Sequence, residues 1–142
     1  MKELLSNLIT NYPNVYAPVA RGGSHAVFDR ITSDPTKAES NYVRTILPPK
    51  KYLMPQHESL VSFKLGENPE FSEVVEAPKQ VIVGVRPSDV RAIKLLDDVM
   101  ISNNCDKNYK ARRDNTIIIG IDGIPDEYSY EDSAMDLHVT VV

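Results

Sequence analysis

The sequence predicts an α/β fold: a small mixed sheet with a parallel βαβ core, an N-terminal helix and a β-hairpin. Two short runs, QVIVGV (80–85) and NTIIIGI (115–121), are apolar almost throughout, as strands buried on both faces should be. Between them, apolar residues recur at helical spacing from 92 to 100. A right-handed crossover through that helix would make the two strands parallel.

The N-terminal third predicts a helix followed by a hairpin. Apolar residues at 4, 5, 8 and 9 have helical spacing, and the helix should end before Pro13. Two β-rich runs, 15–19 and 25–31, flank Gly22-Gly23, so one of these glycines should supply a positive φ in the turn. Residues 32–39 are polar and predict an exposed loop.

The middle of the chain is interpreted as a helical turn and a second loop. Pro55 could begin the turn, with Leu60, Val61 and Phe63 packing inward. The polar stretch 66–78 would then be a loop, and the closing run from Leu137 one more strand. In the crossover helix we expect a single inward stripe, made of Ala92, Leu95, Leu96, Val99 and Met100.

Length and composition limit the class of protein. The 142 residues fit a single domain, 1–142. The net charge of -4 argues against nucleic-acid binding, and one cysteine excludes an intramolecular disulfide. With no secretory signal and no apolar run of membrane-spanning length, we expect a cytoplasmic protein without a membrane span.

Several motifs resemble one family. GVRPSDVRAIKLLD (84–97), DKNYKARRDN (106–115), the lysine-rich run 50–58 and the closing DLHVT (136–140) are similar to the family of the sulfhydrogenase beta subunit and the A component of anaerobic sulfite reductase. The resemblance implies kinship with [4Fe–4S] electron-transfer subunits of redox complexes. It also implies that the partner is another protein of such a complex.

The resemblance further implies where the cluster cysteines should lie, and none is present. The family has a cysteine after Gly-Val-Arg-Pro, where this chain has Ser88. The other vacated ligand positions correspond to Asp122, Tyr128 and Tyr130. Because cubane clusters are held by thiolates, we expect no iron–sulfur cofactor here. Ser88 could instead cap the helix, and the tyrosines could fill the vacated space.

Other candidate sites have both a structural and a functional interpretation. Arg86, Lys110, Arg112 and Arg113 could bind an anion or an acidic partner, or form salt bridges within the chain. We expect no metal site, since the acidic tail does not match a calcium loop and the histidines are far apart in sequence. No catalytic motif is recognisable, so we expect a protein that is not an enzyme.

Three hypotheses about function follow. The first is a cluster-less, non-enzymatic accessory or protein-binding module of a redox complex. The second is an electron-transfer protein with an unconventionally bound iron–sulfur cluster, for example between two copies through Cys105. The third is a small-molecule or metal-binding protein that uses the vacated pocket. The sequence leaves a homo-oligomer open.

Overall fold

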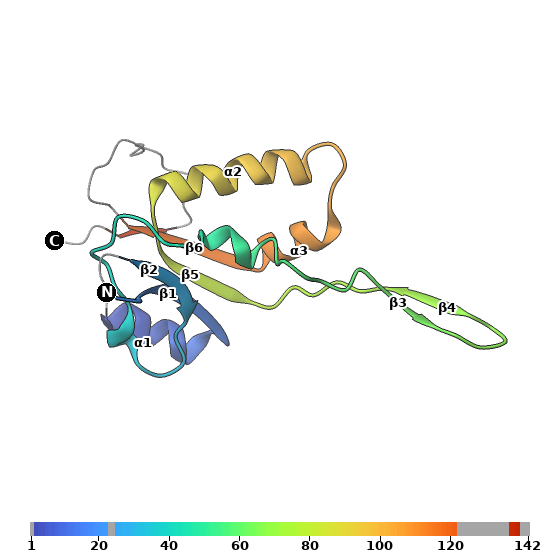
Figure 1. The fold of residues 1–142 in the computed structure, drawn as a ribbon, viewed down its shortest axis with the longest axis horizontal. Helices are drawn as coiled ribbons and strands as arrows, with labels where there is room; N and C mark the ends of the chain where they lie inside the picture. The colour runs from blue at the N-terminus through green and yellow to red at the C-terminus, as the bar shows by residue number, and fades with distance from the viewer. Residues whose placement is uncertain (1, 23–24, 122–136, 140–142) are drawn as a thin grey trace.

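The computed structural model describes residues 2–22, 25–121 and 137–139. Figure 1 shows a body of sheet and helices, from which one hairpin extends. The elements are α1 (Lys2–Asn11), β1 (Asn14–Ala20), β2 (Ala26–Arg30), η1 (Pro35–Lys37), η2 (Pro49–Tyr52), β3 (Val61–Lys64), β4 (Glu70–Glu73), β5 (Gln80–Val85), α2 (Pro87–Ile101), α3 (Lys107–Asp114), β6 (Thr116–Ile121) and β7 (Leu137–Val139).

The main sheet has the strand order β2-β1-β5-β6-β7. Only β1 and β2 pair antiparallel, whereas β5 is parallel to both β1 and β6, and β6 is parallel to β7. The mixed sheet, the N-terminal helix, the βαβ unit and the hairpin are therefore confirmed. Gly22 has φ 91°, so the expected positive φ lies in the predicted turn.

Two apolar layers cover the sheet, with α2 and α3 on one face and α1 on the other (Figure 1). Side chains of β5 alternate between them: Ile82 packs in the α2 layer, and Val81 and Val83 pack in the α1 layer. Every residue of β5 is buried, as a continuously apolar strand requires.

Gly84 interrupts this alternation in β5. The pairing with β6 shifts register between Val83 and Val85, and Gly84 has φ 81°. A bulged residue of this kind changes which face the following side chain meets. Val85 consequently packs in the same layer as Ile82, below the start of α2.

The crossover helix α2 forms as predicted, but the predicted stripe is partly wrong. Val90 and Ile93 are the buried residues of α2, while Leu95 and Val99 are each 65% exposed. Apolar residues cover a wide arc of the helix surface. Only the edge of that arc that faces the sheet, with Val90 and Ile93, is buried. Helix α3 and the β3–β4 hairpin are further elements that the sequence interpretation missed.

Residues 60–75 form an arm, the hairpin of β3 and β4 with the residues flanking it, which extends away from the main sheet (Figure 1). The expected inward packing of Leu60, Val61 and Phe63 is wrong, because all three are exposed. The expected loop at 66–78 is likewise wrong in part, since it contains β4. Side chains alternate with a period of two here, as in a strand, and not at helical spacing.

Candidate functional site

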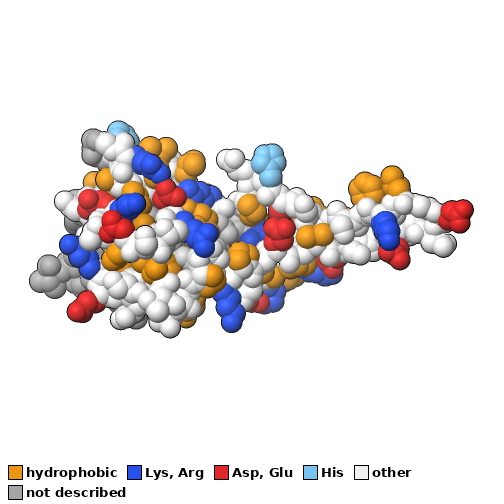
Figure 2. All heavy atoms as spheres, turned by 90° about the horizontal axis from the view of Figure 1, so that it is seen from below, with side chains coloured by type: hydrophobic (Ala, Val, Ile, Leu, Met, Phe, Trp, Pro, Cys, Tyr) orange, Lys and Arg blue, Asp and Glu red, His pale blue; other side chains and the backbone are white. Residues whose placement is uncertain are grey.

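The arm has one apolar and one polar face. Phe63 lies opposite Phe71 in the β3–β4 register, and Val61 lies opposite Glu73. Because side chains alternate across a strand and directly opposite residues share a face, Val61, Phe63 and Phe71 lie on one face, with Glu73 on the same face at the base of the arm. The opposite face carries Ser62, Lys64, Glu70 and Ser72. Figure 2 shows hydrophobic side chains gathered on one side of the arm.

The apolar face is open to solvent. Phe63 is 65% exposed and Phe71 is 74% exposed, and Leu65 at the tip reaches 82%. An isolated two-stranded hairpin is marginally stable in water, and a contiguous apolar patch of several hundred Å² marks an interaction site. These residues thus form the most exposed apolar surface of the described chain.

Helix α3 holds both ends of the arm. On the side that enters β3, Glu58 accepts from Arg112 Nη1 at 2.6 Å. On the side that leaves β4, Glu73 accepts from Lys107 Nζ at 3.0 Å. Just beyond α3, Asn115 Nδ2 donates to the carbonyl of Ala77 at 2.9 Å. These contacts place the base of the arm along α3, from its first residue to the residue just beyond its end.

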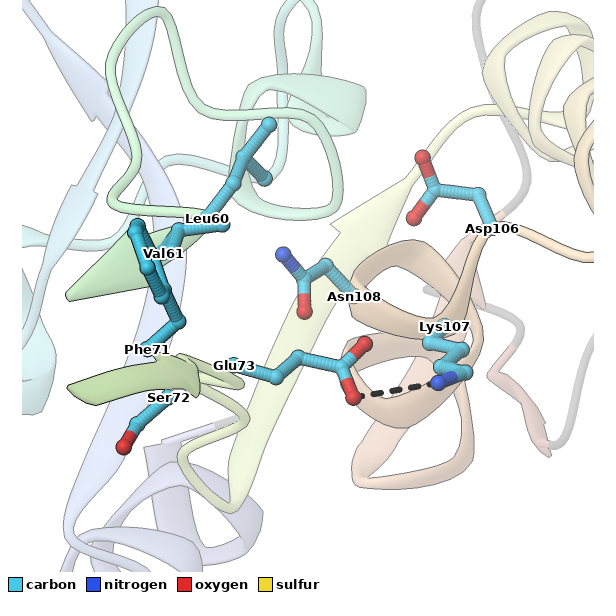
Figure 3. Close-up of a pocket in the computed structure, with 8 residues that line it drawn as sticks. All are labelled: Leu60, Val61, Phe71, Ser72, Glu73, Asp106, Lys107 and Asn108. Atoms are coloured by element: carbon cyan, nitrogen blue, oxygen red, sulfur yellow. Dashed lines mark hydrogen bonds and ion pairs between the residues drawn. The ribbon is translucent and has the colours of Figure 1, made fainter. Parts of the chain in front are cut away.

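A groove of about 570 Å³ lies between the arm and the start of α3. Figure 3 shows Leu60, Val61 and Phe71 on the arm side, with Lys107 on the helix side. Asn108 projects between them and is only 7% exposed. Its Oδ1 accepts no hydrogen bond from the residues that the structure describes. A buried polar atom without a partner is uncommon and calls for an explanation.

A second hollow, of about 290 Å³, lies where α2 begins. Its lining residues are Val43, Arg44, Thr45, Pro48, Arg86, Ser88 and Asp89. The expectation that Ser88 caps α2 is wrong, because the N-cap residue is Arg86 and no side chain caps the helix. Pro87 takes the first helical position, where its missing N–H needs no acceptor, so the helix begins one residue before Ser88.

Arg86 acts within the chain. It is buried, and its Nη2 donates to the carbonyl oxygens of Tyr42 and Ser40. Its guanidinium also lies over the Tyr42 ring, at 4.4 Å from the centroid. These contacts hold residues 40–42 against the start of α2. A role of Arg86 in binding an anion remains a prediction, and it would require a ligand inside the cavity.

Burial changes the acidity of two groups near this cavity. It raises the pKa of the Tyr42 phenol, whose hydroxyl donates to the carbonyl of Gly84 at 2.5 Å. It also raises the pKa of the Asp89 carboxyl, and the Lys50 ammonium opposes that shift. Both shifts follow from desolvation, which disfavours the charged form.

The side chains present do not fit an iron–sulfur cluster of the kind the resemblance implies. Ser88 lies at the start of α2, and the single cysteine, Cys105, lies beyond its other end. At 1.5 Å per residue, the helix separates them by about 20 Å. No three or more His, Cys, Asp or Glu side chains within 2–22, 25–121 and 137–139 could hold a metal ion together. Asp122, Tyr128 and Tyr130 lie outside the described residues.

The four basic candidates do not form one site. Arg112 is 5% exposed and contacts Glu58 and the Leu53 carbonyl. Arg113 Nε donates to Asp97 at 3.0 Å, and Lys110 pairs with Asp114 at 2.7 Å. These contacts favour the structural interpretation for Arg112 and Arg113. An anion- or partner-binding role of these four residues stays a prediction. Lys110 has the most exposed side chain of the three on α3.

The arm and Asn108 are the site residues that sequence interpretation missed. The signal for the arm was present: Val61-Ser62-Phe63-Lys64-Leu65 alternates strictly, and Gly66 and Pro69 follow where a hairpin needs its turn. Nothing in the sequence marks Asn108, because its position depends on how α3 packs against the arm.

None of the described helices is long and apolar enough to cross a membrane.

The fold and the site define a mixed α/β protein with an exposed apolar arm and a small cavity at the start of its crossover helix. Its sequence is 37% identical over 135 residues to the sulfhydrogenase 2 subunit beta of Pyrococcus furiosus. This similarity confirms the resemblance to the sulfhydrogenase beta subunit that the motifs predict.

The relation covers the chain and the relative unequally. The aligned region is 92% of this chain but 39% of the sulfhydrogenase subunit. The chain therefore spans well under half the length of the relative it matches. No protein-family model matches the sequence, and no solved structure matches it.

Proposed function

We propose that the chain is a protein-binding module of a redox complex and carries no iron–sulfur cluster of its own. The observation that carries this proposal is the position of the single thiol, about 20 Å along α2 from Ser88. Four thiolates normally hold a [4Fe–4S] cluster, and one cysteine per chain cannot supply them. A resemblance to a family does not by itself transfer the activity of the larger subunit.

Two features support the protein-binding part of this proposal. The relative is named as the beta subunit of a sulfhydrogenase, and a subunit by definition contacts other chains. The arm presents an apolar face that the described part of the chain leaves uncovered.

Iron analysis tests the cluster-free part. Protein purified without oxygen should contain far less than stoichiometric iron and acid-labile sulfide, and it should lack visible absorbance. The Cys105→Ser variant should give the same values, since Cys105 is exposed and holds nothing in this proposal. Near-stoichiometric iron and sulfide that disappear in Cys105→Ser would instead establish an unconventional cluster held by Cys105.

Co-purification tests the binding part. A tagged chain expressed at its native level should recover a redox-complex protein in constant proportion to itself. Recovery of the chain alone, at physiological salt and without oxygen, would contradict a role as a binding module.

The cavity beside Ser88 favours one further candidate, a site for a small anionic molecule. About 290 Å³ is near the lower limit for ligand pockets. Arg44 and Arg86 contribute positive charge to its lining against the single carboxyl of Asp89, whose pKa burial raises. Ser88→Phe would fill the opening. If the candidate is right, inorganic phosphate raises the melting temperature of the wild type and not of Ser88→Phe.

A further inference from the structure

We propose that the apolar face of the arm and the groove at its base bind one segment of a partner protein, which carries apolar side chains and at least one lysine or arginine. This inference rests on the proposed function and names the surface and the partner's chemistry. Three independent features of the described residues support it: the two-faced arm, its charge, and the buried acceptor of Asn108.

The first feature is the separation of apolar and polar side chains on a hairpin that no layer of the described chain covers. Val61, Phe63 and Phe71 share the exposed face, and Leu60 and Val61 continue it into the groove. A hairpin with one apolar face gains stability when a second layer covers that face. The base of the arm contacts α3 through the buried Arg112 side chain and Glu58, and the exposed pair of Lys107 and Glu73 lies beside this contact.

The second feature is charge. Residues 60–75 contain Glu67, Glu70 and Glu73 against the single basic Lys64. Glu70 lies opposite Lys64 and Glu73 pairs with Lys107, but the groove adds the carboxylate of Asp106. Four carboxylates against two lysines leave the arm and groove with a net charge of -2. Complementary charge favours association and like charge opposes it. A partner with lysine or arginine beside its apolar residues suits this surface better than a second acidic copy of the chain, whose net charge is -4.

The third feature is Asn108. Its Oδ1 is buried in the groove and accepts no hydrogen bond from the described residues. A buried acceptor without a donor costs free energy, and a bound segment could supply an N–H or an ammonium group. The groove thus presents a hydrogen-bonding position beside the apolar residues Leu60, Val61 and Phe71 (Figure 3).

The size of the surface indicates how the segment binds. Each strand of the arm is four residues long, roughly 13 Å at about 3.3 Å per residue, and paired strands lie about 5 Å apart. A face of these dimensions is well below the area of about 800 Å² that each partner contributes to a stable interface, so two arms packed face to face would fall short. A segment that lies along the arm and continues into the groove of about 570 Å³ buries more surface and also reaches Asn108.

Site-directed photocrosslinking provides the first test. The Leu65→Cys/Cys105→Ser variant is labelled with a benzophenone maleimide and irradiated in native extract. The control carries the label at Leu95→Cys in the same background, because Leu95 is exposed and belongs to α2, which lies apart from the arm in Figure 1. We expect the arm label, and not the α2 label, to capture one protein through a peptide that is apolar and contains lysine or arginine.

Affinity for the purified captured protein provides the second test. Phe63→Ser/Phe71→Ser should weaken binding at least tenfold without lowering the melting temperature, because both rings are exposed. Leu95→Ser/Val99→Ser removes apolar side chains of similar exposure from α2 and should leave the affinity unchanged. Equal affinity of the arm variant and the wild type overturns the inference, as does capture of a second copy of the chain.

Asn108→Leu tests the groove separately. Leucine has nearly the shape of asparagine but no acceptor, so the melting temperature should stay equal or rise while binding weakens severalfold. An unchanged affinity would exclude the groove from the interface. If the tagged wild type recovers no redox-complex protein, the proposed function fails; if it recovers one that the arm variant also recovers, only this inference fails.

Discussion

Replacing Arg112 with methionine is expected to lower the free energy of unfolding by about 2–3 kcal/mol. Methionine keeps the apolar stem of the side chain but removes every donor. The Leu53 carbonyl, which accepts from Nε at 2.8 Å, loses its partner, and Glu58 loses the cation at 2.6 Å. The loss is below that of a fully buried pair, because the Glu58 side chain is 26% exposed and can be hydrated in part. Urea unfolding measures the difference.

Lys110→Met is the matched control for Arg112→Met. Lys110 belongs to the same helix and also forms an ion pair, with Asp114 four residues later. That pair is exposed, and exposed pairs contribute little to stability. Unfolding midpoints of Lys110→Met and the wild type should nearly coincide. A loss as large as that of Arg112→Met would mean that general charge on α3, and not the buried contact, stabilises the fold.

Arg112 also shows what the sequence could not predict about the basic run. Its neighbours in the chain are consistent with either an exposed anion site or internal salt bridges. The choice depends on Glu58, which lies 54 residues earlier and meets Arg112 only when the base of the arm packs on α3. Pairings at this separation leave no local pattern, so both interpretations stay open until the fold is known.

The buried strands were predictable for a physical reason. Six consecutive residues that are almost all apolar, as in β5, have no polar face to place in water, so the strand must lie between two layers. The helix between β5 and β6 then fixes the parallel crossover. The turn at Gly22 was similarly local, because a tight hairpin needs positive φ, and glycine adopts it without strain.

The arm was harder to predict, although its alternation is regular. The pattern Val61-Ser62-Phe63-Lys64-Leu65 indicates two faces but cannot say whether a layer of the same chain covers the apolar one. Sequence reasoning places apolar residues inside by default, which led to the inward interpretation of Phe63. An apolar face left open is a departure from that default, and such departures are expected where a surface has a function.

Gly84→Ala is expected to destabilise the fold by about 2–3 kcal/mol, mostly through backbone strain. Gly84 has φ 81°, a conformation that costs an L-residue about 1–2 kcal/mol. A Cβ there would also lie 3.1 Å from Cδ of Pro18 on the neighbouring strand β1, which is held in the sheet. The bulge cannot simply relax, because it sets which layer Val85 enters and presents the carbonyl that accepts from Tyr42.

Gly66→Ala separates this strain from the general effect of removing a glycine. Gly66 lies in the arm's turn, its φ is outside the strained range, and a Cβ would meet nothing within 4 Å. Alanine there should leave stability equal or slightly higher, since it restricts the unfolded chain. Thermal unfolding should show a melting temperature several degrees lower for Gly84→Ala only. Equal melting temperatures would mean that β5 can lose its bulge without cost, and that the approach of Pro18 to Gly84 does not constrain the sheet.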